Sequence, residues 1–516
     1  QKARRMVEVA VQRRRRHVFL FRHCVRSTPK TLQIYENGNN GTERNISDFT
    51  SQTLPEWNTP EYWCTQDGMT ILTNTGQFLL EHILLGGAND DHNNTTIQLQ
   101  FITDTSQRDV DTAFALASGI AMSAAAHSNL NVSGLDNLRY DASLFKPFEA
   151  KNFSSTSSTS PLCNKTAFND TITFHEMQQR WQTIPPPSEG WNETIRRLEQ
   201  YLFEDAIGDN RGTNTKDFLI PTNFSFNERT GKIEGGTHVV HLLAQMAFYS
   251  RAGGVDPPFL PKLTPNMVYG LLKWVNWSRS VLSIANSKSA AEGSIMAHEV
   301  IQALQEDEEQ NKNDDDNVKD DNKNNATTVV VATIIVGHDT QLDTIATALG
   351  LRWKLNAPYN SETKEHGGIE YVPTPPGSGM HFVHDLESQK LGLSYLYPVY
   401  STMDTTTIHR PTWNPNSSGI LESVPLQFVP PLPPSITNPY MSPSTLWLSS
   451  PDGGIDILKK RLGSIIDSYQ PAVKECYMAA ITERSSSIAA ASAGGGGKLP
   501  YKEFEEDLIV FLDDND

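Results

Sequence analysis

Long apolar runs are missing from this sequence. No stretch of the 516-residue chain approaches the roughly 20 apolar residues that a membrane-spanning helix needs, so we expect no membrane span. Hydrophobic residues make up 38% of the chain and the mean hydropathy is −0.43, which is typical of a folded body that carries polar inserts. The chain starts at Gln1 without an apolar leader segment, and we interpret it as a mature or trimmed product.

Positive charge is also scarce. The chain has 43 Lys and Arg residues against 60 Asp and Glu residues, which gives a formal net charge of −17 at pH 7. A protein that binds a nucleic acid needs a basic stripe for the phosphate backbone, so we expect no nucleic-acid partner. The basic run Arg13–Arg16 precedes the first apolar segment, and we interpret it as a solvated lead-in rather than a nuclear or lipid-binding signal.

Cysteine and metal-ligand clusters are few. The four cysteines, Cys24, Cys64, Cys163 and Cys476, permit three full pairings, and some bridge is expected in an oxidising compartment. The histidines of Thr237–His241 have no carboxylate or cysteine at metal-ligand spacing. We therefore expect no metal site there.

The first informative segment joins a strand to a loop that contains a histidine. The apolar residues Val18–Phe21 predict a buried strand, and Arg22, His23 and Arg26 follow it directly. Two arginines crowded around one histidine favour an anion, because the planar guanidinium group suits phosphate oxygens. His23 could then act as a nucleophile on a phosphoryl group.

A second segment repeats this layout much later in the chain. The β-branched run Val329–Val336 predicts another strand, which is followed by Gly337, His338 and Asp339 and then by a helix over Leu342–Leu349 that ends at Gly350. Ligands of open α/β sheets bind beyond the carboxyl ends of the strands. We therefore expect the two histidine loops to meet at one edge of a sheet.

These segments give the chain a resemblance to a known family. Phe21–Arg26 resembles the RHGxRxP motif of the histidine acid phosphatases, in the branch that includes bacterial periplasmic phytases and glucose-1-phosphatases. Gly337–Thr340 resembles the distal HD motif of that family. Ser106–Arg108 resembles the segment that carries its third phosphate-binding arginine. The resemblance implies a phosphoglycerate-mutase-like α/β sandwich domain with an inserted, mainly helical domain.

The resemblance also implies the roles of individual residues. His23 would be the nucleophile that forms a phosphohistidine, and Asp339 would be the acid that protonates the leaving group and then activates water. Lys30 falls where phytase-type members carry a lysine that faces the substrate. The expected reaction is acid phosphatase hydrolysis of a small phosphomonoester, without metal or cofactor. Four groups would clamp the phosphate oxygens: Arg22, Arg26, Arg108 and His338.

The cysteines carry one departure from the family and one further implication. Cys24 stands where the family motif has glycine, so a thiol could crowd the pocket or strain the loop. The alternative is therefore a catalytically impaired protein that only binds phosphorylated ligands. Cys163 and Cys476 resemble a phytase disulfide pair, and we predict that bond. The sequence does not decide whether Cys24 and Cys64 pair, and we leave them free.

The predicted organisation follows composition and periodicity. Residues 1–136 form the first half of the α/β domain and 137–304 the helical insert. Residues 305–326 form a disordered acidic loop, 327–480 the second α/β half, and 481–516 a flexible Gly-rich and acidic tail. Leu72 and Thr73 resemble a helix start with a threonine cap. The insert should contain five helices: Glu176–Trp181, Trp191–Phe203, Val239–Ser250, Pro265–Ala285 and Ala290–Leu304.

The asparagine pattern points to the secretory route. If the source is eukaryotic, we expect about half of the thirteen acceptor sequons to carry N-linked glycans, in a protein that is secreted or lies in a lysosomal, vacuolar or other endomembrane lumen. A glycosylated surface protein with coincidental motifs is the competing interpretation. The sequons are at Asn40, Asn45, Asn93, Asn94, Asn131, Asn152, Asn164, Asn169, Asn192, Asn223, Asn276, Asn325 and Asn416.

Overall fold

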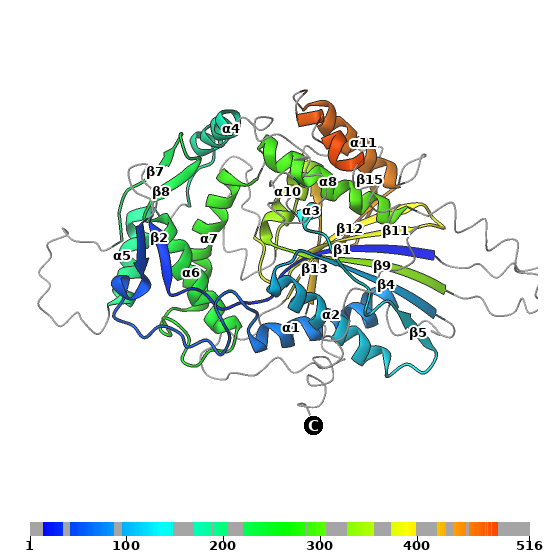
Figure 1. Cartoon of the computed structure of the whole chain (residues 1–516), viewed down its shortest axis with the longest axis horizontal. Helices are drawn as coiled ribbons and strands as arrows, with labels where there is room; N and C mark the ends of the chain where they lie inside the picture. Colours follow the sequence, from blue (N-terminus) through cyan, green and yellow to red (C-terminus); the bar gives the residue numbers. More distant parts are fainter. Residues whose placement is uncertain are drawn as a thin grey trace, which may run out of the picture.

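The computed structural model describes most of the chain, and Figure 1 shows its arrangement. The predicted acidic loop beyond Gln305, the predicted tail beyond Thr482, and both Cys163 and Cys476 lie outside the described residues. The described residues are 14–34, 42–86, 95–145, 147, 170–187, 190–203, 220–284, 286–305, 328–355, 373–398, 421–429, 437–442, 444–449, 454–469, 471, 473–475 and 477–482.

One mixed sheet of ten described strands lies at the centre (Figure 1). Its order is β15-β16-β12-β11-β1-β9-β4-β5, with β13 paired to β12 and β6 paired to β4. The strands are β1 (Arg14–Arg22), β4 (Thr95–Thr103), β5 (Leu130–Ser133), β6 (Leu138–Tyr140), β9 (Thr328–Gly337), β11 (Gly379–Asp385), β12 (Lys390–Pro398), β13 (Leu421–Pro425), β15 (Thr437–Ser442) and β16 (Thr445–Leu448).

Three parallel strands in the middle of the sheet bring the predicted motifs together. β9 lies between β1 and β4 and runs parallel to both. The register pairs Arg22 with Gly337 and Thr103 with Val336, so the three strands end at the same level. The loops after β1, β9 and β4 therefore meet at one edge of the sheet, as the strand patterns predict.

Side chains of a strand alternate between the two faces of a sheet. Both faces of this sheet carry apolar side chains, and helices cover them. Phe19 and Phe21 belong to the core cluster shared with α1 (Gln66–Phe78) and α2 (Gln107–Ala124). Val18 and Leu20 belong to the cluster shared with α8 (Ser287–Leu304), α10 (Asp339–Leu349) and α11 (Gly454–Asp467). The result is a helix–sheet–helix sandwich (Figure 1).

The helix start expected at Leu72 and Thr73 was wrong. α1 begins at Gln66, and the side chain of Thr65 caps it by accepting a hydrogen bond from the Gly68 N–H. Thr73 lies inside the helix and donates its hydroxyl to the Met69 carbonyl. Thr65 is an equally good capping residue, and a single sequence gave no reason to prefer it. A π-helical segment, Leu79–Leu84, continues α1.

A second group of helices lies beside the sandwich, at the left of Figure 1. Its core contains the indoles of Trp191, Trp274 and Trp277, which contact one another edge to face. Two hairpins, β2–β3 (Thr31–Ile34 and Thr42–Asn45) and β7–β8 (Phe224–Asn227 and Lys232–Gly235), accompany these helices. The helices are α4 (Asp170–Thr183), α5 (Trp191–Leu202), α6 (Thr237–Ala252) and α7 (Pro265–Leu282).

These elements confirm the predicted fold class, an α/β sandwich with a mainly helical part. The five helices expected between Glu176 and Leu304 are all present, with α8 packed on the sandwich instead of the helical group. Smaller elements are α3 (Ala142–Phe145), the 3₁₀ helix Ile46–Phe49 and the paired strands β10 (Leu351–Arg352) and β14 (Gln427–Phe428).

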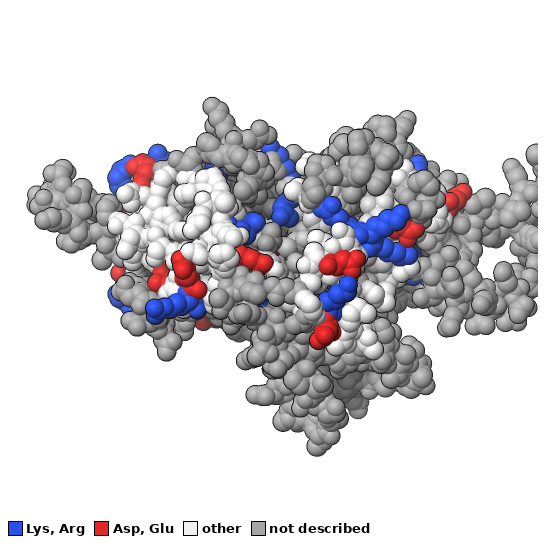
Figure 2. Space-filling model, turned by 90° about the horizontal axis from the view of Figure 1, so that it is seen from above, with Lys and Arg blue, Asp and Glu red and all other residues white. Residues whose placement is uncertain are grey.

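Two properties of the described residues concern possible binding partners: the apolar character of the helices and the distribution of surface charge. Among the helices that the structure describes, none combines the length and apolar character that crossing a membrane requires. Figure 2 shows basic and acidic side chains interspersed on the face that it draws, with a largely uncharged area at the left. Charge on this face is therefore mixed in sign.

Candidate active site

The backbone around His23 is fixed on two sides. The Arg22 N–H donates to the Ser378 carbonyl at 2.7 Å, and the His23 N–H donates to the Gly337 carbonyl at 2.8 Å. The Gly377 N–H in turn donates to the His23 carbonyl at 3.0 Å. Gly377 has a φ of +70°, a conformation that favours glycine, so this residue allows the turn to approach the histidine loop.

The His23 side chain is buried and held in one orientation. It is 3% exposed, and its Nδ1 lies 2.9 Å from the Cys24 carbonyl oxygen. A carbonyl only accepts, so Nδ1 carries the proton and the Nε2 lone pair is available. Burial first, and then the charges of Arg22 and Arg108, lower the pKa of His23 well below its usual value. The neutral form of the imidazole is therefore favoured.

Arg22 is the best anchored cation of the site. One guanidinium nitrogen donates to the Tyr249 hydroxyl at 2.7 Å, and another donates to the Thr374 carbonyl. The same group lies 3.3 Å from the Asp339 carboxylate. These partners come from α6, the loop before β11 and the start of α10, so Arg22 links the helical group to the edge of the sheet.

Arg26 and Arg108 supply two further cations near His23. The Arg26 guanidinium lies over two tyrosine rings, 5.0 Å from the Tyr62 centroid and 5.6 Å from the Tyr249 centroid. Arg108 lies in the first turn of α2 and points its guanidinium at His338. Burial and the neighbouring charge of Arg26 lower the pKa of Arg108, which indicates a crowded positive site. An anion at this position would relieve that repulsion.

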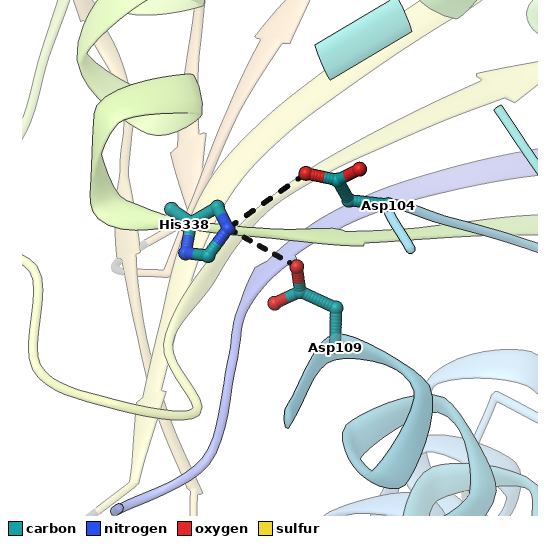
Figure 3. A group of neighbouring side chains, drawn as sticks. All are labelled: Asp104, Asp109 and His338. Carbon is teal, nitrogen blue, oxygen red and sulfur yellow. Dashed lines mark ion pairs between the residues drawn. The ribbon is translucent and has the colours of Figure 1, made fainter. Parts of the chain in front are cut away.

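His338 lies between the Arg108 guanidinium and two carboxylates, and Figure 3 shows the carboxylates of Asp104 and Asp109 beside its ring. Its Nδ1 lies 2.8 Å from the Arg108 guanidinium, and its Nε2 lies 3.2 Å from Asp109 and 4.0 Å from Asp104. Arginine only donates, so Nδ1 accepts and Nε2 carries a proton that faces Asp109. Burial and the charge of Arg108 lower the pKa of His338 to about 4.

Asp104, Asp109 and His338 are also residue types that can bind a metal ion. Asp104, Asp109 and His338 offer ligand atoms within 4.8 Å of one another. Because His338 Nδ1 accepts from Arg108, its Nε2 carries a proton at the position that a metal ion would need. The positive charge of the Arg108 guanidinium also opposes the binding of a metal cation next to it. The arrangement therefore fits a histidine that is hydrogen-bonded to Arg108 and lies against two carboxylates.

Asp339 faces the pocket as the first residue of α10. Its side chain is 25% exposed and pairs with Arg22. Burial alone would raise the pKa of this carboxyl, but the charges of Arg22 and Arg279 outweigh burial and lower the pKa below its usual range. The positive end of the helix acts in the same direction. Beside these two arginines, Asp339 is therefore a carboxylate.

A second ion pair lies one turn further along α10. Asp343 is 0% exposed and accepts a bidentate pair of hydrogen bonds from Arg279 of α7. Arg279 also donates to the Thr374 hydroxyl at 2.5 Å. Burial raises the pKa of Asp343 to about 6, although the charge of Arg279 partly offsets this effect. This pair connects the helical group to the helix that carries Asp339.

A pocket with a cavity volume of about 60 Å³ opens beside Arg22 and Asp339. Its wall combines one lysine, two amides and two phenols with apolar side chains and a proline-rich segment. A mixture of apolar and polar groups is typical of pockets that bind small molecules. The lining residues are Arg22, Gln245, Phe248, Tyr249, Tyr269, Leu272, Lys273, Val275, Asn276, Arg279, Asp339, Pro373, Thr374, Pro375 and Pro376.

The structure corrects the interpretation of two cysteines. Cys24 and Cys64, which were left free, form a disulfide with Cα atoms 5.6 Å apart. The bond is possible because residues 63–65 run antiparallel to residues 25–27 and bring Cys64 alongside the loop. Tyr62, Leu260 and Gln389 are the described non-glycine residues with positive φ, so Cys24 does not occupy a glycine conformation.

The predicted site residues do not all come together. His23, Arg22, Arg26, Arg108, His338 and Asp339 lie close together at the sheet edge, and Arg22 and Asp339 also line the pocket. Lys30 is exposed, does not line the pocket, and contacts Glu61 through its backbone N–H at 3.3 Å. The sequence analysis missed Asp104, Asp109, Tyr249, Arg279 and Asp343. Asp104 directly follows β4, which was a usable signal, whereas the residues of α6 and α7 gave none.

Comparisons with known proteins agree with this architecture. No family model matches the sequence, and no curated protein matches it significantly. The phytase from Citrobacter braakii is similar in structure with a TM-score of 0.57 and 16% identity, over 90% of this chain and 99% of that chain. The Hafnia alvei phytase in complex with myo-inositol hexakis sulphate gives 0.52 and 16%, over 90% and 98%. The Klebsiella sp. ASR1 phytase gives 0.51 and 15%, over 90% and 98%.

These likenesses extend over nearly the whole of each phytase and include both the sandwich and the helical part. At this level of identity they establish architecture. The chain therefore has the fold of the bacterial phytases, which is the fold that its resemblance to the histidine acid phosphatases implies.

Proposed function

We propose that this protein is an acid phosphatase that hydrolyses phosphomonoesters through a phosphohistidine. The observation that carries the proposal is the state of the His23 imidazole. Its contact with the Cys24 carbonyl places the ring proton on Nδ1, its lowered pKa favours the neutral form, and cations surround it. A neutral imidazole with a fixed tautomer is a competent nucleophile. Arg22, Arg26 and Arg108 supply the positive charge that a phosphoryl group needs.

The reaction would proceed in two balanced steps. His23 Nε2 attacks phosphorus, the bond from phosphorus to the ester oxygen breaks, and the leaving oxygen takes the proton of the Asp339 carboxyl. A water molecule then attacks the phosphohistidine while the Asp339 carboxylate accepts a proton from it. The step releases inorganic phosphate, and His23 and Asp339 return to their starting states.

The proton on Asp339 requires a bound substrate. The charge of Arg22 holds the pKa of Asp339 below its usual range. The phosphate group of an ester brings negative charge to the same arginine, which offsets its effect and raises the pKa of Asp339 in the complex. The protonated form is then most populated in acid solution, so we propose an acidic pH optimum.

The pocket supports a polar alcohol as the leaving group. Lys273 offers positive charge, and Gln245 and Asn276 offer amides to hydroxyl or phosphate groups. The similar Hafnia alvei phytase has been observed with myo-inositol hexakis sulphate, a polyanion on a ring. We therefore propose sugar phosphates and inositol phosphates as the preferred substrate classes.

The catalytically impaired alternative is less well supported. That alternative assumed that a thiol at Cys24 would crowd or strain the loop after β1, residues 23–27, which we call the phosphate loop. The Cys24 sulfur is instead bonded to Cys64, and the residue does not need a positive φ. The buried disulfide also favours an oxidising compartment, so we propose secretion or an endomembrane lumen, with N-linked glycans at exposed sequons such as Asn45, Asn131, Asn192 and Asn223.

A phosphoenzyme trap tests the proposal. We expect the protein to hydrolyse p-nitrophenyl phosphate at pH 4–6 in the presence of a chelator, and to show acid-labile, base-stable label on His23 after rapid quenching. His23→Ala should lose both properties, by at least about a thousand-fold in kcat. His298→Ala, on the outer part of α8, is the matched control and should behave as wild type. Unlabelled, inactive wild type would contradict the proposal.

A further inference from the structure

The Cys24–Cys64 disulfide lies next to three residues of the candidate active site, His23, Arg26 and Arg108. Both cysteines are buried, at 1% and 6% exposure. Cys24 follows His23 directly, Cys64 pairs with Arg26 in a β-bridge, and the Cys64 sulfur lies 3.5 Å from the Arg108 carbonyl oxygen. The bond therefore joins the phosphate loop to the segment before α1 and to the first turn of α2.

The first connection concerns the orientation of His23. The imidazole is held by the Cys24 carbonyl, so its direction depends on the plane of the Cys24 peptide. The Cys24 N–H donates to the Thr112 hydroxyl at 2.9 Å, and the same hydroxyl donates to the Arg108 carbonyl at 2.7 Å. The disulfide adds a covalent restraint to the residue that supplies both backbone contacts.

The second connection concerns Arg26. The Ser27 N–H donates to the Trp63 carbonyl and the Thr65 N–H donates to the Val25 carbonyl, both at 2.9 Å, on either side of the disulfide. Tyr62 lies next to this short ladder in a left-handed conformation, with a φ of +68°. Its ring lies against the Arg26 guanidinium. Holding Cys64 in place therefore keeps Tyr62 against the cation.

We propose that the Cys24–Cys64 disulfide positions the nucleophile and two phosphate-binding arginines, so that catalysis depends on the oxidised bond. This inference rests on the proposed phosphatase function. Reduction by a dithiol would convert the bond to two thiols, with transfer of two electrons and two protons, while the dithiol becomes a disulfide. The loop could then move, and misplacement of reacting groups by about 1 Å costs about a hundred-fold in rate.

The test compares two double variants of the full chain. Cys24→Ser with Cys64→Ser removes the bond at the site with little change in volume. Cys163→Ser with Cys476→Ser is the matched control, because it removes two cysteines that the proposal does not place at the site. We expect the first variant to lose about ten- to a hundred-fold in kcat and to bind inorganic phosphate more weakly by calorimetry. The control should keep both values within about twofold of wild type.

A second measurement separates positioning from stability. The Cys163→Ser, Cys476→Ser variant, in which Cys24–Cys64 is the remaining possible disulfide, is reduced by dithiothreitol and its thiols are counted by mass spectrometry. It should lose activity at a temperature where circular dichroism shows it folded, and reoxidation should restore that activity. A lower melting temperature with unchanged kcat and phosphate affinity would overturn the inference and leave the phosphatase proposal intact. Oxidised wild type without turnover or phosphohistidine would overturn the phosphatase proposal, and phosphate calorimetry on the two variants would still decide the role of the disulfide.

Discussion

The two walls of the candidate active site have different origins. One wall is the edge of the sheet, where His23, His338 and Asp339 follow strands directly. The other wall is formed by α6 and α7 of the helical group, through Tyr249, Lys273 and Arg279. The strand ends hold the groups that would perform the chemistry. The helices hold groups that adjust charge and shape, so we expect changes at the sheet edge to have far larger effects on turnover.

Asp339→Asn gives the sharpest test of the sheet edge. We expect kcat to fall by about 10²- to 10⁴-fold, because both the acid and the base of the reaction are lost. The loss should be larger for an alkyl phosphate than for p-nitrophenyl phosphate, whose leaving group needs little protonation. Steady-state kinetics with the two substrates measure this difference.

Asp111→Asn is the matched control for that variant. Asp111 lies on α2, where it accepts a hydrogen bond from Gln107, and it should leave both rates within about twofold of wild type. An Asp339→Asn protein with the rates of the Asp111→Asn protein would remove Asp339 from the mechanism.

Asp343→Asn tests the helical wall through its pH dependence. The pKa of Asp343 is raised to about 6, so wild type gains a negative charge beside Arg279 as pH rises through that value. That charge weakens the attraction of the pocket for an anion, whereas asparagine stays neutral. The KM of the variant divided by that of wild type should fall from about one at pH 4.5 to about one third at pH 7.

The ratio is the useful quantity because the ionisation of the substrate phosphate cancels in it. Values of kcat should change little, since Asp343 does not face the reacting atoms. A ratio that stays constant from pH 4.5 to pH 7 would show that the Arg279–Asp343 pair does not tune the pocket.

The prediction with the smallest expected effect concerns N-linked glycosylation of the sequon at Asn276. This residue lines the pocket, and Trp277 and Ser278 of the same sequon are 1% and 4% exposed. A glycan there would fill the space proposed for substrate. In a secretory eukaryotic host, peptide mass spectrometry should find modification at exposed Asn45 and Asn192 and none at Asn276. A glycan on Asn276 in active protein would contradict the proposed position of the leaving group.

Local motifs made the sheet edge predictable. A strand followed directly by Arg22 and His23, and another followed by His338 and Asp339, fix both the residue and its place at a carboxyl end. The helix after Asp339 was equally clear, and its end at Gly350 is confirmed by a φ of +65° there. The boundary of α1 failed because Thr65 and Thr73 are both acceptable caps.

The helical wall could not be predicted in the same way. Arg279 lies 64 positions from Asp343 in sequence, and Tyr249 lies 227 positions from Arg22. Neither contact has a local pattern, because each depends on how the helical group packs against the sandwich. The Cys24–Cys64 bond failed for a related reason, since its two halves meet through an antiparallel contact between loops.

By itself, the sequence determined the class of fold and the residues at the carboxyl ends of the central strands, because alternation along a strand and the residues that follow it are local properties. Tertiary structure decided the partner of Cys24, the carboxylates that hold His338, and the ion pair between α7 and α10. Those contacts join segments that are far apart in the chain, and packing of the two helical layers and the sheet sets their distances.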